Sequence, residues 1–254
     1  LPVDLFFPLP AKEIEKYKNQ LLGIERRDHF IGIWVNRNAK RKRPNDVLES
    51  WSIFLKQLKR KKGHKKATLI MHTDPLDNEG PNLFKTAEVL GIQENVFFSK
   101  DRLEFEKMNV LYNISDCCMN ISYAEGFGLS TLEAMMTGTP IIAAKTGGLT
   151  RQVCNSIKGG ENGIALSIDV QTLVGSQSVP YIYEDYVSTK NVAQGIMKLY
   201  KMPKKEKDRL SKKVLKYART EFGYQKTIDQ WHDTMLASYT QFKDNPRKWE
   251  KIII

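Results

Sequence analysis

The sequence has little cysteine and little histidine, which excludes several kinds of site. Its 254 residues include three cysteines and four histidines. An odd cysteine count, with two of the three adjacent, argues against a disulfide framework and for a reducing compartment. None of the cysteines stands in a CxxC or Cys/His spacing typical of a metal site. We therefore expect Cys117, Cys118 and Cys154 to be small buried side chains.

Long apolar runs are also absent. No run approaches the roughly 18 residues that a membrane-spanning helix needs. The opening residues, LPVDLFFPLP, are too short and too rich in proline for a signal peptide, and they lack a basic start. The chain begins with Leu rather than Met, so we expect a piece of a longer protein, with residues 1–10 as an extended linker. We expect its location to be cytoplasmic.

Two common nucleotide-binding motifs are missing. The sequence has neither the GxGxxG of dinucleotide-binding proteins nor the GxxxxGK of P-loop proteins. NAD and ATP sites of those kinds are therefore not expected.

Acidic residues are outnumbered. Lysine and arginine total 40 against 29 aspartates and glutamates, which gives a net charge of +11. This excess indicates an anionic partner: a nucleic acid, an acidic membrane surface bound peripherally, or a phosphorylated small molecule. Much of it lies in Lys40–Arg43 and in Lys59–Lys66, the second of which we interpret as a solvated corner. Aromatic residues are not interleaved with these runs, so nucleic acid is the least favoured partner.

Short apolar runs alternate with helix-spaced apolar residues along most of the chain. Phe30–Asn36, FIGIWVN, is typical of a strand buried on both faces, and Pro44 opens the helix after it. This alternation predicts an α/β fold: a doubly wound, Rossmann-like parallel sheet of about six strands, followed by a helical tail. The other predicted strands are Thr68–His72, Asn95–Phe98, Cys117–Ser122, Pro140–Ala144 and Ile164–Leu166. The other predicted helices are 11–22, Leu83–Leu90, Phe105–Asn113, Leu129–Thr137, Val187–Tyr200, Lys204–Glu221 and Tyr224–Phe242.

The loops that follow the strands are where a ligand of such a sheet would bind. They are rich in small, polar and charged residues. His72 ends one of these strands, and a hydrogen-bonded structural role explains it more readily than catalysis. The loops concerned are Asn36–Arg43, His72–Gly80, Ser99–Leu103, Tyr123–Gly128 and Lys145–Gly148.

The stretch Ala124–Gly148 holds the densest set of candidate groups. Gly126 and Gly128 let the backbone bend where a loop becomes a helix, and the first residues of that helix would offer free N–H groups to an anion. Glu125 and Glu133 flank this turn and could accept hydrogen bonds from hydroxyl-rich groups. A phosphate between two polyols describes a nucleotide sugar. From the spacing alone, a tight turn that carries two solvent-exposed carboxylates is an equally good interpretation.

The basic loop Asn36–Arg43 is the second candidate element. Arg37 and Lys42 could both point at a diphosphate. A basic loop that is merely exposed is the alternative. Gly147 and Gly148 permit close backbone approach to a ligand, and plain turn residues explain them equally well.

Together these motifs resemble the C-terminal, donor-binding domain of a GT-B glycosyltransferase of the retaining family 4. The hallmark of that family is a Glu-x7-Glu element, EGFGLxxLEAMxxGxPV, and this chain has EGFGLSTLEAMMTGTPI. The chain departs from the family at Ser130, where Pro is usual, and at Arg43, where Gly usually follows the lysine. The resemblance covers roughly residues 30–220. Family members need no metal, and no DxD occurs here.

The resemblance implies roles for individual residues. Glu133 would bind the ribose hydroxyls and Glu125 the hydroxyls of the donor sugar, while Arg37 and Lys42 would neutralise the diphosphate. Glu125, Arg37 and Lys42 are thus the expected catalytic residues. The other expected donor contacts are Gly126, Phe127, Gly128, Leu129, Ser130, Gly147 and Gly148, with Ser99, Lys100 and Arg102 near the base.

The resemblance also implies half of a GT-B architecture. Residues 1–29 would be an interdomain linker with a short helix, 30–222 the nucleotide-sugar-binding domain, and 223–254 a helix packing on an N-terminal acceptor domain missing from this chain. Alone, the chain would bind its donor and transfer poorly or not at all. The alternatives are a non-catalytic nucleotide-sugar-binding module and a basic nucleic-acid-binding domain. The NRN loop resembles mannosyltransferase-like members, which favours GDP-mannose over UDP-sugars.

Overall fold

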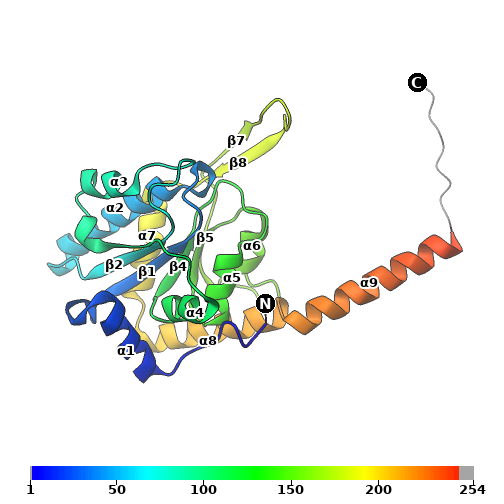
Figure 1. Ribbon diagram of the computed structural model, residues 1–254, viewed down its shortest axis with the longest axis horizontal. Helices are drawn as coiled ribbons and strands as arrows, with labels where there is room; N and C mark the ends of the chain where they lie inside the picture. The colour runs from blue at the N-terminus through cyan, green and yellow to red at the C-terminus, as the bar shows by residue number, and fades with distance from the viewer. Residues whose placement is uncertain (1, 246–254) are drawn as a thin grey trace.

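The computed structural model describes residues 2–245 and contains a six-stranded parallel sheet with helices on both faces (Figure 1). The strands are β1 Phe30–Val35, β2 Ala67–His72, β3 Val96–Ser99, β4 Cys117–Asn120, β5 Ile141–Ala144 and β6 Gly163–Leu166. They lie in the order β3-β2-β1-β4-β5-β6, so the winding reverses between β1 and β4. The predicted doubly wound, Rossmann-like sheet is confirmed.

The helices alternate with these strands and then continue as a tail. They are α1 Ala11–Leu22, α2 Pro44–Lys62, α3 Leu83–Val89, α4 Phe105–Asn113, α5 Leu129–Met136, α6 Gly147–Val153, α7 Thr189–Lys201, α8 Lys204–Glu221 and α9 Tyr224–Asp244. Single 3-10 turns occur at η1 Ile24–Arg26, η2 Lys40–Lys42 and η3 Gln93–Asn95.

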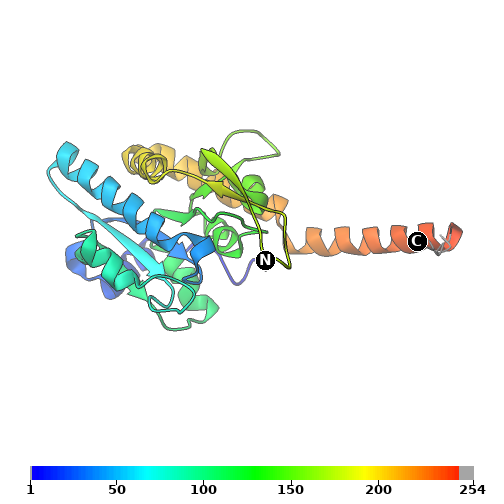
Figure 2. The same cartoon turned by 90° about the horizontal axis from the view of Figure 1, so that it is seen from above.

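The two faces of the sheet bury separate hydrophobic layers, because successive strand residues point to opposite sides. In β1, Phe30 and Trp34 join the layer under α2, α3 and α7, whereas Ile31 joins the layer under α1, α4, α5, α6 and α8. Helices α2 and α7 pack along the same face (Figure 2). Trp51 of α2 is fully buried, and a Cβ on Gly32 would lie 2.9 Å from its ring. The glycine therefore makes room for the indole at the centre of the sheet.

The cysteines fit the prediction only in part. Cys117 and Cys118 are buried in β4, whereas Cys154 is half-buried just beyond α6. Burial raises the pKa of both strand thiols well above the usual range, so they stay protonated and behave as small core residues.

The segment after β5 differs from its prediction as a loop. Gly147 and Gly148 begin helix α6, with Gly147 at φ 44. Two consecutive glycines indicate a turn in a sequence, because glycine is a poor helix former. Here the helix begins at them all the same, and both positions are glycine because the loop after β4 lies against them and leaves no space for a Cβ.

A hairpin of β7 Val170–Val174 and β8 Ile182–Tyr186 occupies a segment for which the sequence predicts no element. In Figure 1 it projects from the top of the domain, above β5. None of its strand residues is buried, so its sequence lacks the alternation of a half-buried strand. Helix α7 begins after it, where Ser188 Oγ accepts a hydrogen bond from the Asn191 N–H at 3.3 Å.

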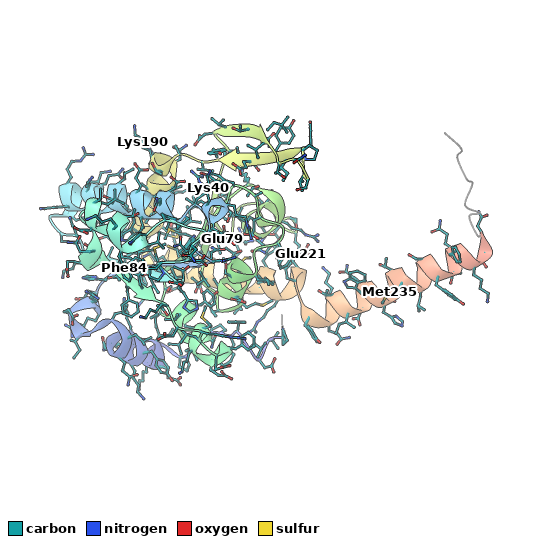
Figure 3. The ribbon with its side chains drawn as sticks, turned by 45° about the horizontal axis from the view of Figure 1, so that its top comes forward. Lys40, Glu79, Phe84, Lys190, Glu221 and Met235 are labelled. Carbon is teal, nitrogen blue, oxygen red and sulfur yellow. The ribbon has the colours of Figure 1, made fainter. Side chains whose placement is uncertain are left out.

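Helix α9 extends away from the domain, and none of its residues is buried (Figure 1). Met235, labelled in Figure 3, is 57% exposed, and Trp231 is 64% exposed. Within residues 2–245, no helix combines the length and the apolar character needed to cross a membrane.

Two tryptophans provide a matched test of where the stability lies. Trp51→Ala should lower the free energy of unfolding by about 3–5 kcal/mol, because it opens a cavity beneath β1. Trp231→Ala on α9 removes the same side chain from an exposed position and should change it by less than about 0.5 kcal/mol. Denaturant titration measures both, and equal losses would show that the core is not built around Trp51.

Candidate functional site

The loops after β1 and β4 meet where the strand order reverses. The Tyr123 N–H donates to the Arg41 carbonyl at 3.0 Å and ties the two loops together. Doubly wound sheets bind their ligands at this switch point, beyond the carboxyl ends of the strands. The structure therefore places the two candidate stretches, the basic loop and the Glu-x7-Glu element, side by side.

A nearly buried ion pair joins these loops. Lys42 Nζ donates to Glu125 Oε2, and the two side chains are only 9% and 12% exposed. Lys42 ends the 3-10 turn η2, and Glu125 begins the turn that leads to α5. Ser122 Oγ lies 3.5 Å from the same carboxylate oxygen. Removing both charges from water is costly unless they remain paired, so the pair fixes the distance between the two loops.

Close backbone packing holds the turn before α5. The Gly148 N–H donates to the Glu125 carbonyl at 3.0 Å, and a Cβ on Gly148 would lie 2.5 Å from the Gly126 carbonyl. Gln152 Nε2 of α6 donates to the carbonyls of Phe127 at 2.6 Å and Gly128 at 3.1 Å. The glycines after β5 thus allow the turn before α5 to pack closely against them.

Helix α5 begins at an exposed position. Gly128 caps it at φ 87, in the left-handed region, and Leu129 at its first position is 59% exposed. Phe127, just before the cap, is 42% exposed. The first-turn amides of a helix have no intrahelical acceptor and form a partial positive charge. Here Leu129 and Ser130 supply such amides at the sheet edge where a ligand would bind.

Glu133 is half-buried one turn further along α5. The hydroxyl of the fully buried Tyr112 donates to Glu133 Oε2 at 2.6 Å. Burial raises the pKa of Glu133, and the hydrogen bond from Tyr112 partly opposes this shift. The tyrosine fixes one carboxylate oxygen, so the carboxylate is oriented before any ligand arrives.

Arg37 is held apart from the Lys42–Glu125 pair. Its Nε and Nη2 donate to Asp77 at 2.7 and 3.2 Å, and its Nη1 lies 2.9 Å from Glu79. These bonds raise the pKa of Arg37 and lower that of Asp77. The loop after β2 is itself joined to the basic loop, since the Lys40 N–H donates to the Glu79 carbonyl at 3.3 Å (both labelled in Figure 3).

The residues expected near a base lie at the end of β3. His72 Nδ1 and Ser99 Oγ are 2.9 Å apart, which accords with the structural interpretation of that histidine. Burial lowers the pKa of His72, so the ring is neutral near pH 7. Lys100 and Arg102 are exposed just beyond the strand.

Sequence reasoning missed three residues that shape this site. Tyr112 orients Glu133 from α4, and Asp77 binds Arg37 from the loop after β2. Neither carries a local signal, because their partners are distant in sequence. Arg43 is the third: its guanidinium lies over the ring of Tyr123, in the loop after β4. Its position before Pro44 in a basic loop was the available signal.

The fold and the switch-point site define a Rossmann-like α/β protein of the kind that binds its ligand between β1 and β4. Residues 18–167 match the model of the family described as Glycosyl transferases group 1. This match covers more than half of the chain, which therefore belongs to that family, of GT-B type.

Two curated relatives are similar to part of this chain. The chain is 34% identical over 164 residues to the D-inositol 3-phosphate glycosyltransferase of Corynebacterium jeikeium, which covers 64% of this chain and 37% of the relative. It is 38% identical over 77 residues to the enzyme of the same description from Mycolicibacterium smegmatis, covering 30% and 18%. The chain thus spans well under half the length of these relatives.

Solved structures share the fold. HepE of Anabaena in complex with UDP-glucose aligns with a TM-score of 0.70 at 18% identity, over 94% of this chain and 56% of that one. Sucrose-phosphate synthase of Thermosynechococcus elongatus gives 0.68 at 20% identity, over 94% and 51%. The C-terminal domain of LpcC from Francisella tularensis gives 0.65 at 19% identity, over 88% and 99%.

The raised pKa of Glu133 makes stability depend on pH. The folded chain holds the Glu133 proton more tightly than the unfolded chain does, so this carboxyl stabilises the fold at low pH. Its contribution is lost as the pH rises through the raised pKa. Glu133→Gln should remove that loss in denaturant titrations between about pH 4 and pH 8. Tyr112→Phe should move the loss to higher pH, because it removes the opposing hydrogen bond. An unchanged pH profile in Glu133→Gln would contradict this assignment.

Proposed function

We propose that this chain is the C-terminal, donor-binding half of a retaining, family 4 glycosyltransferase that takes a sugar from a nucleoside diphosphate sugar. The observation that carries the proposal is the Lys42–Glu125 pair at the switch point, next to the exposed start of α5. Cation, carboxylate and helix amides together suit a ligand that has a diphosphate next to a polyol.

The diphosphate is assigned to the amides of Gly128–Ser130 and to the ammonium of Lys42. A phosphate oxygen there would take over the Lys42 contact now made by Glu125, which would free that carboxylate for hydroxyls of the donor sugar. Arg37 would exchange Asp77 and Glu79 for the phosphate. Both cations are therefore held by carboxylates that a more highly charged anion can replace.

The nucleoside is assigned to the opposite side of the same edge. Glu133 would accept hydrogen bonds from the ribose hydroxyls with the carboxylate that Tyr112 orients. The base would lie near Ser99, Lys100 and Arg102. Gly126, Phe127, Gly147 and Gly148 shape the turn that brings α5 close to the phosphates.

The chemistry asked of these residues is electrostatic. When the glycosidic bond to the β-phosphate breaks, negative charge grows on the departing nucleoside diphosphate. Lys42, Arg37 and the α5 amides would stabilise that charge more in the transition state than in the ground state. Losing one such contact costs about 3 kcal/mol of transition-state stabilisation. Protein groups, rather than a metal, provide this neutralisation, and the transfer retains the anomeric configuration.

The acceptor side is assigned to a second domain. The likeness to an isolated C-terminal domain, LpcC, supports residues 30–222 as the donor unit. The apolar residues of α9 are exposed, which suits the packing of this helix on an N-terminal domain, with 1–29 as the linker. The last part of the predicted segment 223–254, residues 246–254, lies outside the described residues. We expect the isolated chain to bind its donor without transferring sugar efficiently. The capture of UDP-glucose by HepE supports UDP-sugars as donors beside GDP-mannose.

A nucleotide-sugar-binding experiment tests this function. Thermal-shift screening with GDP-, UDP- and dTDP-sugars should find a donor that stabilises the fold by about 2.7 kcal/mol at about 100 times its Kd. Glu133→Ala should then lower the affinity for that donor by about 10- to 100-fold in calorimetry, because it removes the acceptor of charge-assisted hydrogen bonds. Glu106→Ala, an exposed carboxylate on α4, is the matched control.

Two results would contradict the proposal. Unchanged donor affinity in Glu133→Ala would remove the assigned ribose contact. Binding of oligonucleotides with steep salt dependence, in place of any nucleotide sugar, would support the nucleic-acid alternative instead.

A further inference from the structure

Arg43 has an unusual backbone. It adopts φ 57 and ψ 44, and it is the only non-glycine residue with positive φ within residues 2–245. The left-handed region disfavours side chains that carry a Cβ, and the following Pro44 further restricts its neighbour to extended conformations. Strain of this kind costs about 1–3 kcal/mol and persists only where surrounding contacts enforce it.

The Arg43 side chain makes those contacts. It is 5% exposed, with Nε donating to Asp46 at 2.7 Å and Nη2 donating to the Val187 carbonyl at 2.9 Å. Its guanidinium carbon lies 4.9 Å from the ring centre of Tyr123 and 5.7 Å from that of Tyr186. The two rings pack on each other with their centres 4.4 Å apart.

These contacts join three segments that are distant in sequence. Arg43 directly follows Lys42 in the loop after β1. Tyr123 lies two residues before Glu125 in the loop after β4, and its carbonyl accepts from the Asp185 N–H at 2.8 Å. Tyr186 is the last residue of the hairpin. Each member of the nearly buried ion pair therefore lies within two residues of this cluster in the sequence.

The hairpin has few other attachments. Its strands bury no residue, and Tyr181 at its outer part is 67% exposed. Two-stranded hairpins without further packing are marginally stable in water. Its base is held by Arg43, by the Asp185–Tyr123 hydrogen bond and by the packed rings. The hairpin also begins beyond residue 167, where the match to the family model ends.

We propose that Arg43 is a positioning residue that fastens the hairpin to the site and thereby fixes the direction of Lys42 toward the donor diphosphate. This inference rests on the proposed function, because it assigns Lys42 to the diphosphate. Arg43 itself touches no substrate in this account. Glycine at this position would adopt the same backbone without strain but would also leave it freely. The arginine accepts the strain and holds a single conformation through its partners.

Three variants separate this role from simpler ones. Arg43→Gly allows the left-handed backbone conformation but removes the contacts of the side chain. Arg43→Lys keeps a cation over the rings but loses the planar donor pair. Arg41→Gly removes an equal charge from the adjacent, exposed position. For each variant, calorimetry measures the affinities for UDP and uridine, or for GDP and guanosine, and chymotrypsin cleavage after Tyr181 and Tyr183 reports release of the hairpin.

Arg43→Gly should lower the affinity for the nucleoside diphosphate about tenfold and leave the affinity for the nucleoside unchanged, because only the contact made by Lys42 is misaligned. Arg43→Lys should recover part of that loss. Cleavage in the hairpin should accelerate at temperatures well below global unfolding. Arg41→Gly should show neither effect to this extent.

Several results would overturn the inference. If Arg43→Gly lost equal affinity for the nucleotide and the nucleoside, the variant would be generally destabilised. If Arg41→Gly lost as much diphosphate affinity as Arg43→Gly, the effect would be one of charge alone. Unchanged cleavage would show that Arg43 does not hold the hairpin. If the wild-type chain binds none of UDP, GDP and dTDP, the proposed function fails and the positioning role fails with it, whereas cleavage still decides whether Arg43 fastens the hairpin.

Discussion

The nearly buried ion pair between Lys42 and Glu125 is the constraint on which the rest of the site depends. It spans the switch point, where the chain winds away in opposite directions from β1 and β4. An unpaired charge at either position would be costly, so each loop must reach the other. The glycines after β5, Gln152 and the Tyr123–Arg41 hydrogen bond all act to keep that distance fixed.

Several groups of this edge cost stability rather than adding to it. Glu133 is half-buried and Arg43 holds a strained backbone, while Lys42 is nearly buried. Their costs are offset elsewhere, by the two hydrophobic layers and above all by large side chains such as Trp51. Strain and desolvation concentrated at one edge of a well-packed sheet are what a binding site requires, since they orient polar groups before the ligand arrives.

The sequence could predict the sheet because buried parallel strands such as Phe30–Val35 read as continuous apolar runs. It could also place the loops that follow the strands at one edge of the sheet, because the carboxyl ends of parallel strands lie at the same edge. The strand order, which makes β1 and β4 neighbours, came from the structure. It could not find the hairpin, whose strands face solvent on both sides, or helix α6, which begins with two glycines. The bonds from Arg37 to Asp77 and from Tyr112 to Glu133 join residues far apart in sequence. Such pairings depend on tertiary packing, which no local pattern encodes.

The central claim is that a nucleotide sugar binds at the switch point, with its diphosphate on the start of α5. Backbone amide hydrogen exchange, with and without the donor found by screening, tests this most directly. The account predicts slower exchange at Gly128–Ser130 and in the loop Asn36–Arg43, with no change at Gly63–Lys66 beyond the far end of α2. Protection confined to other parts of the chain, with Gly128–Ser130 unaffected at saturating donor, would contradict it.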